Sequence, residues 1–290
     1  MNDIAKKLLS VLLTLALLCG LTAVAAQGYG AGTKFVVLGD SISAGEGASD
    51  PAKAYARLIA DTRDYDLDNH SVGGNDSNDL LKILEERADV RADIAAADII
   101  NLSIGGNDLL HTNVITMVLR VLFMNDETAA DEYIEAFRVN FALIIEKIRA
   151  LNPDALFIVQ TPYNSMQGVP LVAGAYETVL IRLNKVYAEY LAENPEAYKL
   201  ADMLDMFKGR EGLVYPDRIH PSDAGHELIA EVLTAVIGGT QPNLEPVSGE
   251  EPGFFENVWL FLVAVYEYLS YWLSIYSPLE LLEKAISFII

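Results

Sequence analysis

The sequence predicts an α/β domain with a mainly parallel sheet and helices on both of its faces. Short apolar runs of strand length alternate with longer segments whose apolar residues recur at helical spacing. Polar, glycine-containing loops follow several of these runs, at the sheet edge where open α/β folds hold their ligands. Strands that alternate with helices in this way form parallel sheets, because each crossover helix returns the chain to the same edge.

The elements follow one another without an internal repeat. The expected strands are 34–38, a segment shortly before Asn69, 99–104, 156–159 and 198–201. The expected helices are 52–60, 80–86, 129–150, 172–193 and 222–237. Within 129–150, the residues Tyr133, Phe137, Phe141 and Ile144 recur on one face, and Pro153 follows the end of the helix. The apolar stretch 114–124 has two interpretations, a core helix or a lining or lid of an acyl pocket.

Both ends of the chain differ in composition from the domain, which we place at 34–239. Residues 1–26 combine Lys6 and Lys7, an apolar run and small residues up to Ala26, which predicts a secretory signal peptide cleaved after Ala25 or Ala26. An uncleaved N-terminal anchor is the alternative, because the apolar character reaches spanning length. Residues 240–253, with three prolines and three glutamates, predict a linker.

Residues 254–290 predict an apolar C-terminal helical hairpin. One face of its first helix carries apolar residues at spacings of four and three, from Phe255 to Tyr276, and Ser277-Pro278 begins a second helix. Such a hairpin is too apolar to stand free in water. Docking on the domain or self-association is the first interpretation, and contact with a membrane surface is the second, because Glu267 interrupts the apolar segment.

Composition restricts the classes of function. The 290 residues are 52% hydrophobic, enough for a substantial core. A formal net charge of −21 repels phosphate backbones, so nucleic acid is not expected as a partner. Cys19, within the predicted signal peptide, is the only cysteine, which excludes a disulfide framework or a thiolate metal site in the processed chain. The export signal predicts a secreted or cell-surface location.

Four polar loops supply the groups that acyl transfer needs. Ser41 follows the first strand, Gly74 and Asn107 lie in the loops after the next two, and Asp217 precedes His220 by three residues. A serine becomes a nucleophile when a histidine takes its proton, and a carboxylate fixes the tautomer of that histidine. Backbone and asparagine amides are suitable donors to an oxyanion. The simpler interpretation of the first loop alone is that Asp40 or Ser41 caps a helix.

The four loops together resemble the signature blocks of SGNH (GDSL-type) hydrolases. The matching segments, in the family's order, are Gly39-Asp40-Ser41-Ile42, Asn69 to Gly74, Gly105-Gly106-Asn107-Asp108 and Asp217-x-x-His220. The resemblance covers roughly residues 34–237 and implies a flavodoxin-like three-layer α/β/α sandwich. It implies Ser41 as nucleophile, His220 as general base and Asp217 as its partner. The implied oxyanion hole comprises the amides of Ser41 and Gly74 and the side chain of Asn107. Ile42 replaces the family's leucine, and Gly73-Gly74 leaves an ambiguity of one glycine.

The function that we expect is that of an exported serine esterase or lipase, which cleaves carboxylic esters through an acyl-enzyme without metal or cofactor. Its substrate would be a small acyl ester, a lipid or an O-acetylated glycan. One alternative is a metal-dependent phosphoesterase that uses Asp40, Asn107, Asp108, Asp217 and His220. Another is a cell-surface binding module without catalysis. We expect a structural role for His226 and a surface role for His70 and His111, although these last two flank the crevice loops.

Overall fold

The computed structural model describes residues 28–110, 114–169 and 172–240, together with positions 263 and 266. It is an α/β fold with a five-stranded sheet in the order β2-β1-β3-β4-β5, and every strand pair is parallel. The strands are β1 (Lys34–Gly39), β2 (Asp66–Asn69), β3 (Ile99–Ser103), β4 (Leu156–Gln160) and β5 (Lys199–Ala201). The predicted fold class is therefore confirmed. The predicted signal peptide lies outside the described residues, as do the linker from residue 241 onward and the C-terminal hairpin apart from positions 263 and 266.

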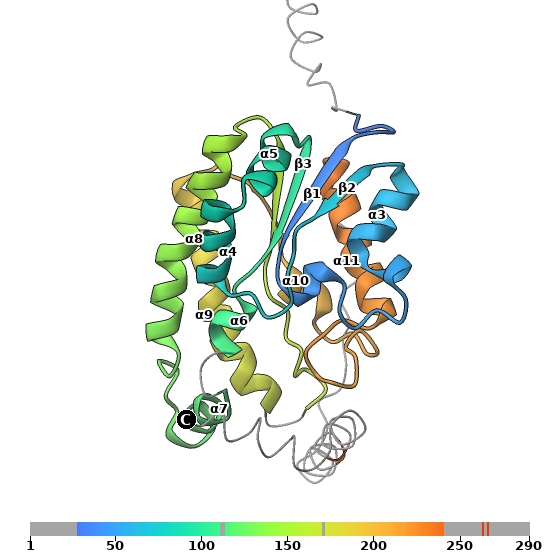
Figure 1. Ribbon diagram of the computed structural model, residues 1–290. Helices are drawn as coiled ribbons and strands as arrows, with labels where there is room; N and C mark the ends of the chain where they lie inside the picture. The colour runs from blue at the N-terminus through green and yellow to red at the C-terminus, as the bar shows by residue number, and fades with distance from the viewer. Residues whose placement is uncertain (1–27, 111–113, 170–171, 241–262, 264–265, 267–290) are drawn as a thin grey trace, which may run out of the picture.

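Helices cover both faces of the sheet, and α4, α5 and α8 lie on the opposite side from α3 and α11 (Figure 1). The helices in the first half of the described chain are α2 (Ser41–Ala44), the 3₁₀ turn η1 (Pro51–Lys53), α3 (Tyr55–Arg63), α4 (Ser77–Glu86), α5 (Ala88–Ala96) and α6 (Gly106–Leu110). Those in the second half are α7 (Val114–Met124), α8 (Asp131–Leu151), α9 (Val172–Glu193), α10 (Met203–Phe207) and α11 (Asp223–Ile237). None of the helices in the described part of the chain is long and apolar enough to cross a membrane.

Alternate residues of the buried strands divide the core into two layers. Val36 and Leu38 of β1 face the helices α4, α5, α8 and α9, whereas Phe35 and Val37 face α3, α10 and α11. All four side chains are almost completely buried. Because a strand covered on both faces has no polar side, it appears in the sequence as a continuous apolar run. This explains why the strands were predicted well.

The helices depart from the prediction at several points. The expected helix 52–60 is divided into η1 and α3, because Ala54 between them is extended. The helices α5 and α10 were not predicted: α5 buries only Val90 and Ile94, and α10 has only five residues. Both provide too few apolar positions to establish a helical period. On α8, Tyr133 is 40% exposed and does not share the buried face of Phe137 and Phe141.

The apolar stretch 114–124 forms a helix, α7, that packs on α9. Met117 and Val118 are buried in the core, as the core-helix interpretation requires. Its C-terminal end differs, because Leu122, Phe123 and Met124 are exposed. The helix therefore joins the core through its middle and leaves an apolar end in solvent.

A buried polar network lies beneath α2. The hydroxyl of Tyr55 is 2.8 Å from Oδ1 of Asn101 in β3, 3.0 Å from Nε2 of Gln160 in β4 and 3.1 Å from Oγ of Ser43 in α2. Gln160 also donates to Asn101 at 2.8 Å. These four side chains are almost fully removed from solvent, so each hydrogen bond satisfies a group that water cannot reach. The network joins α2 to the two central strands.

We expect Tyr55→Phe to lower the free energy of unfolding by about 1–3 kcal/mol, because it leaves buried polar groups of the network without a partner. Equilibrium denaturation in urea measures this loss. Tyr65→Phe is the matched control: Tyr65 is also buried, but its hydroxyl makes a single 3.4 Å hydrogen bond to the carbonyl of Tyr29. The control should lose much less stability, and equal losses in the two variants would show that the network adds nothing.

Candidate active site

The end of β1 places Ser41 at the carboxyl edge of the sheet. Gly39 has φ +142°, and the amide of Asp40 then donates to the carbonyl of Ser103 at 3.2 Å. The Asp40 side chain caps α2 by accepting a 3.0 Å hydrogen bond from the amide of Ile42, and Ser41 is the first residue of the helix. The cap expected from the simpler interpretation is therefore present at Asp40. It holds Ser41, which is 8% exposed, at the helix N-terminus.

The loop before α11 holds Asp217 and His220 together. Oδ1 of Asp217 accepts the amides of Ile219 (2.9 Å) and His220 (3.0 Å), and Oδ2 accepts the ring Nδ1–H of His220 at 2.6 Å. Tyr163 donates from its hydroxyl to the carbonyl of Ile219 at 2.7 Å, which ties the loop to the end of β4. Because Asp217 accepts from two backbone amides and from the ring, it fixes both the backbone of this loop and the orientation of the imidazole.

The charges around His220 favour its protonated form. Burial by itself would lower the pKa of His220, but the hydrogen bond and charge of Asp217 outweigh it, helped by the charges of Glu46 and Asp40, and the pKa is raised above 6.5. Burial acts in the opposite sense on Asp217, where the hydrogen bonds from the ring and from the two amides prevail and lower its pKa. The pair is therefore arranged to stabilise an imidazolium beside a carboxylate.

Gly74 and Asn107 lie in the loops after β2 and β3. Gly74 is exposed, with φ +82°, and Asn107 donates from its side-chain amide to the carbonyl of Asn75 at 2.8 Å. Asn69 fixes the first of these loops by donating to the carbonyl of Ser43 at 2.8 Å. Within the described residues, the backbone amides of Ser41 and Gly74 donate to no protein acceptor. These amides are therefore available to a ligand oxygen.

Asp108 belongs to α6, but its side chain forms hydrogen bonds with the N-terminus of α4. Its side chain accepts from the amide of Ser77 at 3.1 Å and from the hydroxyl of the same residue, at the N-terminus of α4. Burial raises the pKa of Asp108, although both of these hydrogen bonds oppose the shift. Asp108 therefore joins the loop that carries Asn107 to the loop that carries Gly74.

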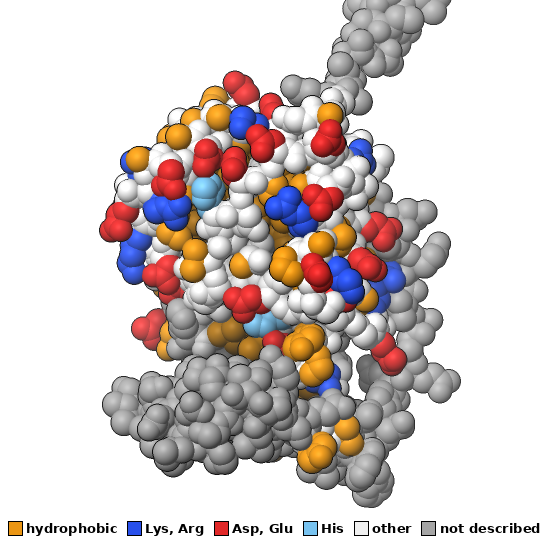
Figure 2. Space-filling model, turned by 45° about the vertical axis from the view of Figure 1, so that its right-hand side comes forward, with side chains coloured by type: hydrophobic (Ala, Val, Ile, Leu, Met, Phe, Trp, Pro, Cys, Tyr) orange, Lys and Arg blue, Asp and Glu red, His pale blue; other side chains and the backbone are white. Residues whose placement is uncertain are grey.

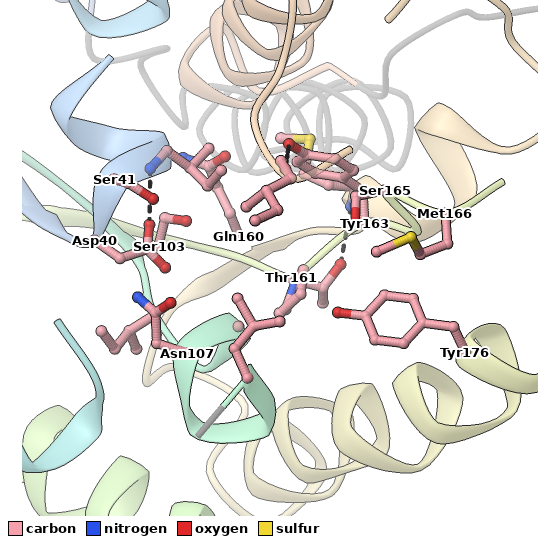
Figure 3. A pocket seen from close by; sticks show the side chains of 17 residues that line it. Asp40, Ser41, Ser103, Asn107, Gln160, Thr161, Tyr163, Ser165, Met166 and Tyr176 are labelled. Atoms are coloured by element: carbon pink, nitrogen blue, oxygen red, sulfur yellow. Dashed lines mark hydrogen bonds between the residues drawn. The ribbon is translucent and has the colours of Figure 1, made fainter. Parts of the chain in front are cut away.

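A cavity of about 60 Å³ opens beside Ser41. Figure 3 shows Ser41 and Asn107 at one end of it, and Met166 and Tyr176 at the other. Ile104, Leu110, Met203 and Ile219 add apolar lining, and no described side chain of α7 takes part. The arrangement brings a hydroxyl and a side-chain amide to the polar end of a largely apolar recess, as binding of an acyl group requires.

The structure separates the histidines. His226 is fully buried: its Nδ1 accepts the amide of Tyr55 at 3.3 Å, and its Nε2 contacts the carbonyl of Glu46 at 3.1 Å. Burial lowers its pKa, and its role is structural, as expected. His70 pairs with Asp93 at 2.8 Å and is partly buried, not a plain surface residue. His111 lies outside the described residues.

Sequence reasoning missed two residues of the site. Oε2 of Glu46 lies 3.3 Å from Nε2 of His220, and Tyr163 holds the His220 loop. The available signal for Glu46 was its place between Gly45 and Gly47, both with positive φ, directly after α2. No hydrogen bond joins Oγ of Ser41 to Nε2 of His220 among the described contacts, and such bonds are often long in enzymes without substrate.

The parallel α/β sheet, a serine at the end of β1 and an Asp–His pair before the last helix together define the class of α/β ester hydrolases. The chain belongs to the GDSL-like Lipase/Acylhydrolase family, whose model matches residues 37–228. This is a family of carboxylic ester hydrolases, which confirms the predicted family and enzyme class.

Several proteins of known sequence or structure are similar to this chain over most of the domain. The chain is 29% identical over 208 residues to the uncharacterized protein YpmR of Bacillus subtilis, covering 67% of this chain and 77% of YpmR. It is 26% identical over 213 residues to the spore germination lipase LipC of Bacillus licheniformis, covering 70% of this chain and 95% of LipC. Among solved structures, the lipase Lip_vut3 from a goat rumen metagenome superposes with a TM-score of 0.57 at 25% identity, covering 72% of this chain and 98% of that one.

Two further structures share the fold. The phospholipase A1 of Streptomyces albidoflavus NA297 has a TM-score of 0.57 at 22% identity, covering 71% of this chain and 99% of its own. Axe2, an acetyl-xylooligosaccharide esterase from Geobacillus stearothermophilus, has a TM-score of 0.52 at 20% identity, covering 77% and 99%. Within the part of the chain that the structure describes, no three His, Cys, Asp or Glu residues are grouped so as to hold a metal ion.

Asp40 is buried next to Ser41, and its ionised form therefore lowers the stability of the fold. Burial raises the pKa of Asp40 from 3.8 to about 7, against the hydrogen bond from Ile42 and the charge of His220. A carboxyl whose pKa is higher in the folded than in the unfolded chain is destabilised when it ionises. Asp40 therefore does not reduce the free energy of unfolding below about pH 4. As the pH rises to about 7, its ionisation lowers this free energy by as much as about 4 kcal/mol.

We expect Asp40→Asn to remove this loss while keeping an oxygen that caps Ile42. The stability advantage of the variant over the parent should be greatest at pH 8 and fall to less than half of that at pH 5, as measured by thermal unfolding. Asp50→Asn is the matched control, since Asp50 caps η1 through the amide of Ala52 at 2.8 Å in an exposed position. A stability difference for Asp40→Asn that does not vary with pH would show that Asp40 ionises normally.

Proposed function

We propose that the chain is an exported serine esterase or lipase that cleaves carboxylic esters through an acyl-enzyme on Ser41. The observation that carries this proposal is the Asp217–His220 pair, joined at 2.6 Å, in the loop that faces the Ser41 helix. The contact is close: a Cβ added at Gly47 would lie 2.7 Å from that of His220. Membership of a family of ester hydrolases supports the same reaction class.

The proposed reaction has two steps. Oγ of Ser41 attacks the ester carbonyl carbon while Nε2 of His220 takes its proton, and Asp217 stabilises the imidazolium through Nδ1. The carbonyl oxygen becomes an oxyanion that accepts from the amides of Ser41 and Gly74 and from Asn107. The alcohol leaves with the proton from His220. Water, deprotonated by His220, then releases the acid and restores Ser41.

The substrates that we propose are acyl esters of small alcohols, lipids or acetylated glycans. The apolar lining of the cavity supports an acyl group, and LipC and Lip_vut3 are named as lipases. A panel of p-nitrophenyl esters of increasing chain length, a lysophospholipid and acetylated xylan separates these classes. Self-association or membrane contact through 254–290 remains a prediction from the sequence.

We expect a fluorophosphonate probe to label the purified protein on Ser41, with loss of fluoride, and to leave Ser41→Ala unlabelled. Asn107→Ala should react about 100-fold more slowly, because one oxyanion donor is missing. Asn194→Ala, an exposed asparagine on the last turn beyond α9, is the control and should react normally. Mass spectrometry of the labelled peptide measures the outcome.

Treatment with EDTA distinguishes the metal-dependent alternative. Serine chemistry predicts labelling and hydrolysis that persist in the chelator. Absent labelling together with chelator-sensitive phosphatase activity would refute the serine mechanism, and absence of every activity would favour the binding module.

Export has its own test. If residues 1–26 are a cleaved signal peptide, protein recovered from outside an expressing bacterial cell should begin at Ala26 or Gln27, depending on the bond cut. N-terminal sequencing reads this directly. A chain that keeps Met1 and stays with the membrane fraction would establish the uncleaved anchor instead.

A further inference from the structure

The imidazole of His220 lies between two carboxylates. Asp217 holds Nδ1 at 2.6 Å, and Oε2 of Glu46 lies 3.3 Å from Nε2, the nitrogen that takes the serine proton in the proposed reaction. The side chain of Glu46 is about half exposed, whereas that of Asp217 is buried. The second carboxylate therefore stands on the more exposed side of the ring.

The backbone of Glu46 is held in place from two sides. Its amide donates to the carbonyl of Ser41 at 3.0 Å, and its carbonyl lies 3.1 Å from Nε2 of His226. Because Nδ1 of His226 accepts the amide of Tyr55, the proton of this neutral ring is on Nε2 and is donated to Glu46. A buried histidine on α11 thus fixes the residue whose carboxylate faces His220.

The loop after β2 leaves room for this carboxylate. A Cβ added at Gly73 would lie 2.1 Å from Oε1 of Glu46, so any larger residue at position 73 would displace it. Glu46 consequently touches the loop of the predicted oxyanion hole as well as the predicted base.

The charges with the largest effect on the pKa of His220 are all negative. Asp217 acts from the same loop, Asp40 and Glu46 act from the two ends of the Ser41 segment, and His226 on α11 is neutral. Each carboxylate stabilises the imidazolium that forms when the proton leaves Ser41. Only Glu46 can also accept the Nε2–H, and while it does so the ring cannot serve as a base.

We propose that Glu46 is a positioning residue, whose carboxylate holds the Nε2 side of protonated His220 and thereby sets the lowest pH at which the ester is cleaved. This inference rests on the proposed function. Deprotonation of His220 releases Nε2 from Glu46 and makes its lone pair available to Ser41. The acid limit of activity then depends on Glu46 as well as on Asp217 and Asp40.

The test compares the pH profile of kcat/KM of the full chain with that of Glu46→Gln, which keeps the size of the side chain and removes its charge. Without Glu46 the imidazolium is less stable, so the acid limb should move to lower pH by about 0.5 to 1 unit. At a pH on that limb, activity relative to the plateau should rise about three- to tenfold. Glu46→Asp should restore part of the difference, and Glu211→Gln, at an exposed position, should leave the profile unchanged.

A second measurement does not depend on turnover. In the Ser41→Ala background, an NMR titration of the His220 ring should give a lower midpoint when Glu46 is replaced by Gln, while the His226 signal stays unchanged. Hydrolysis with a parental pH profile and an unmoved titration would overturn this inference and leave the proposed function intact. Failure of the parent to label or hydrolyse would overturn the proposed function, and the titration would still decide whether Glu46 pairs with His220. Circular dichroism of each variant confirms that it is folded.

Discussion

The active site depends on one close approach between two backbones, that of Gly39 in β1 to the carbonyl of Ser103 in β3. A Cβ at position 39 would lie 1.9 Å from that oxygen, and φ is +142°, so a side chain is excluded twice. The same carbonyl then accepts the amide of Asp40, and the chain turns at once into α2. The position of Ser41 depends on this turn, because the turn places the residue at a helix N-terminus at the carboxyl edge of the sheet.

Polar groups buried under and beside this turn hold it in position, and one of them, the carboxyl of Asp40, lowers the stability when it ionises. The network of Tyr55, Asn101 and Gln160 meets Ser43 from below, and the carboxyl of Asp40 is enclosed next to Ser41. Over the face seen in Figure 2, acidic, basic and hydrophobic side chains are interspersed. Three carboxylates nevertheless act on His220, so the negative charge that matters for chemistry is local. The net charge of −21 instead affects the solubility of the protein and the partners that it can bind.

The sequence was sufficient for features that depend on one segment at a time. Buried strands are continuous apolar runs, and parallel strands end at one edge, so Ser41 and Asn107 could be assigned to a common crevice before the structure was known. Glu46 and Tyr163 could not, because their partners are distant in sequence and depend on loop conformation. The same holds for Asp108, whose side chain reaches across to Ser77. Short helices such as α10 were not predicted, because five residues are too few to show the helical period of apolar positions.

The two adjacent glycines after β2 differ in conformation and in surroundings. Gly74 has φ +82° and open space around it, so its requirement for glycine comes from its backbone conformation. At Gly73 the requirement is space, because the carboxylate of Glu46 occupies the position of a side chain. One glycine thus supports the predicted oxyanion donor, while the other makes room for the carboxylate that faces His220. The predicted oxyanion donor and the residue next to the Glu46 carboxylate are therefore neighbours in a single loop, so the groups proposed to act on the oxyanion and on His220 meet there.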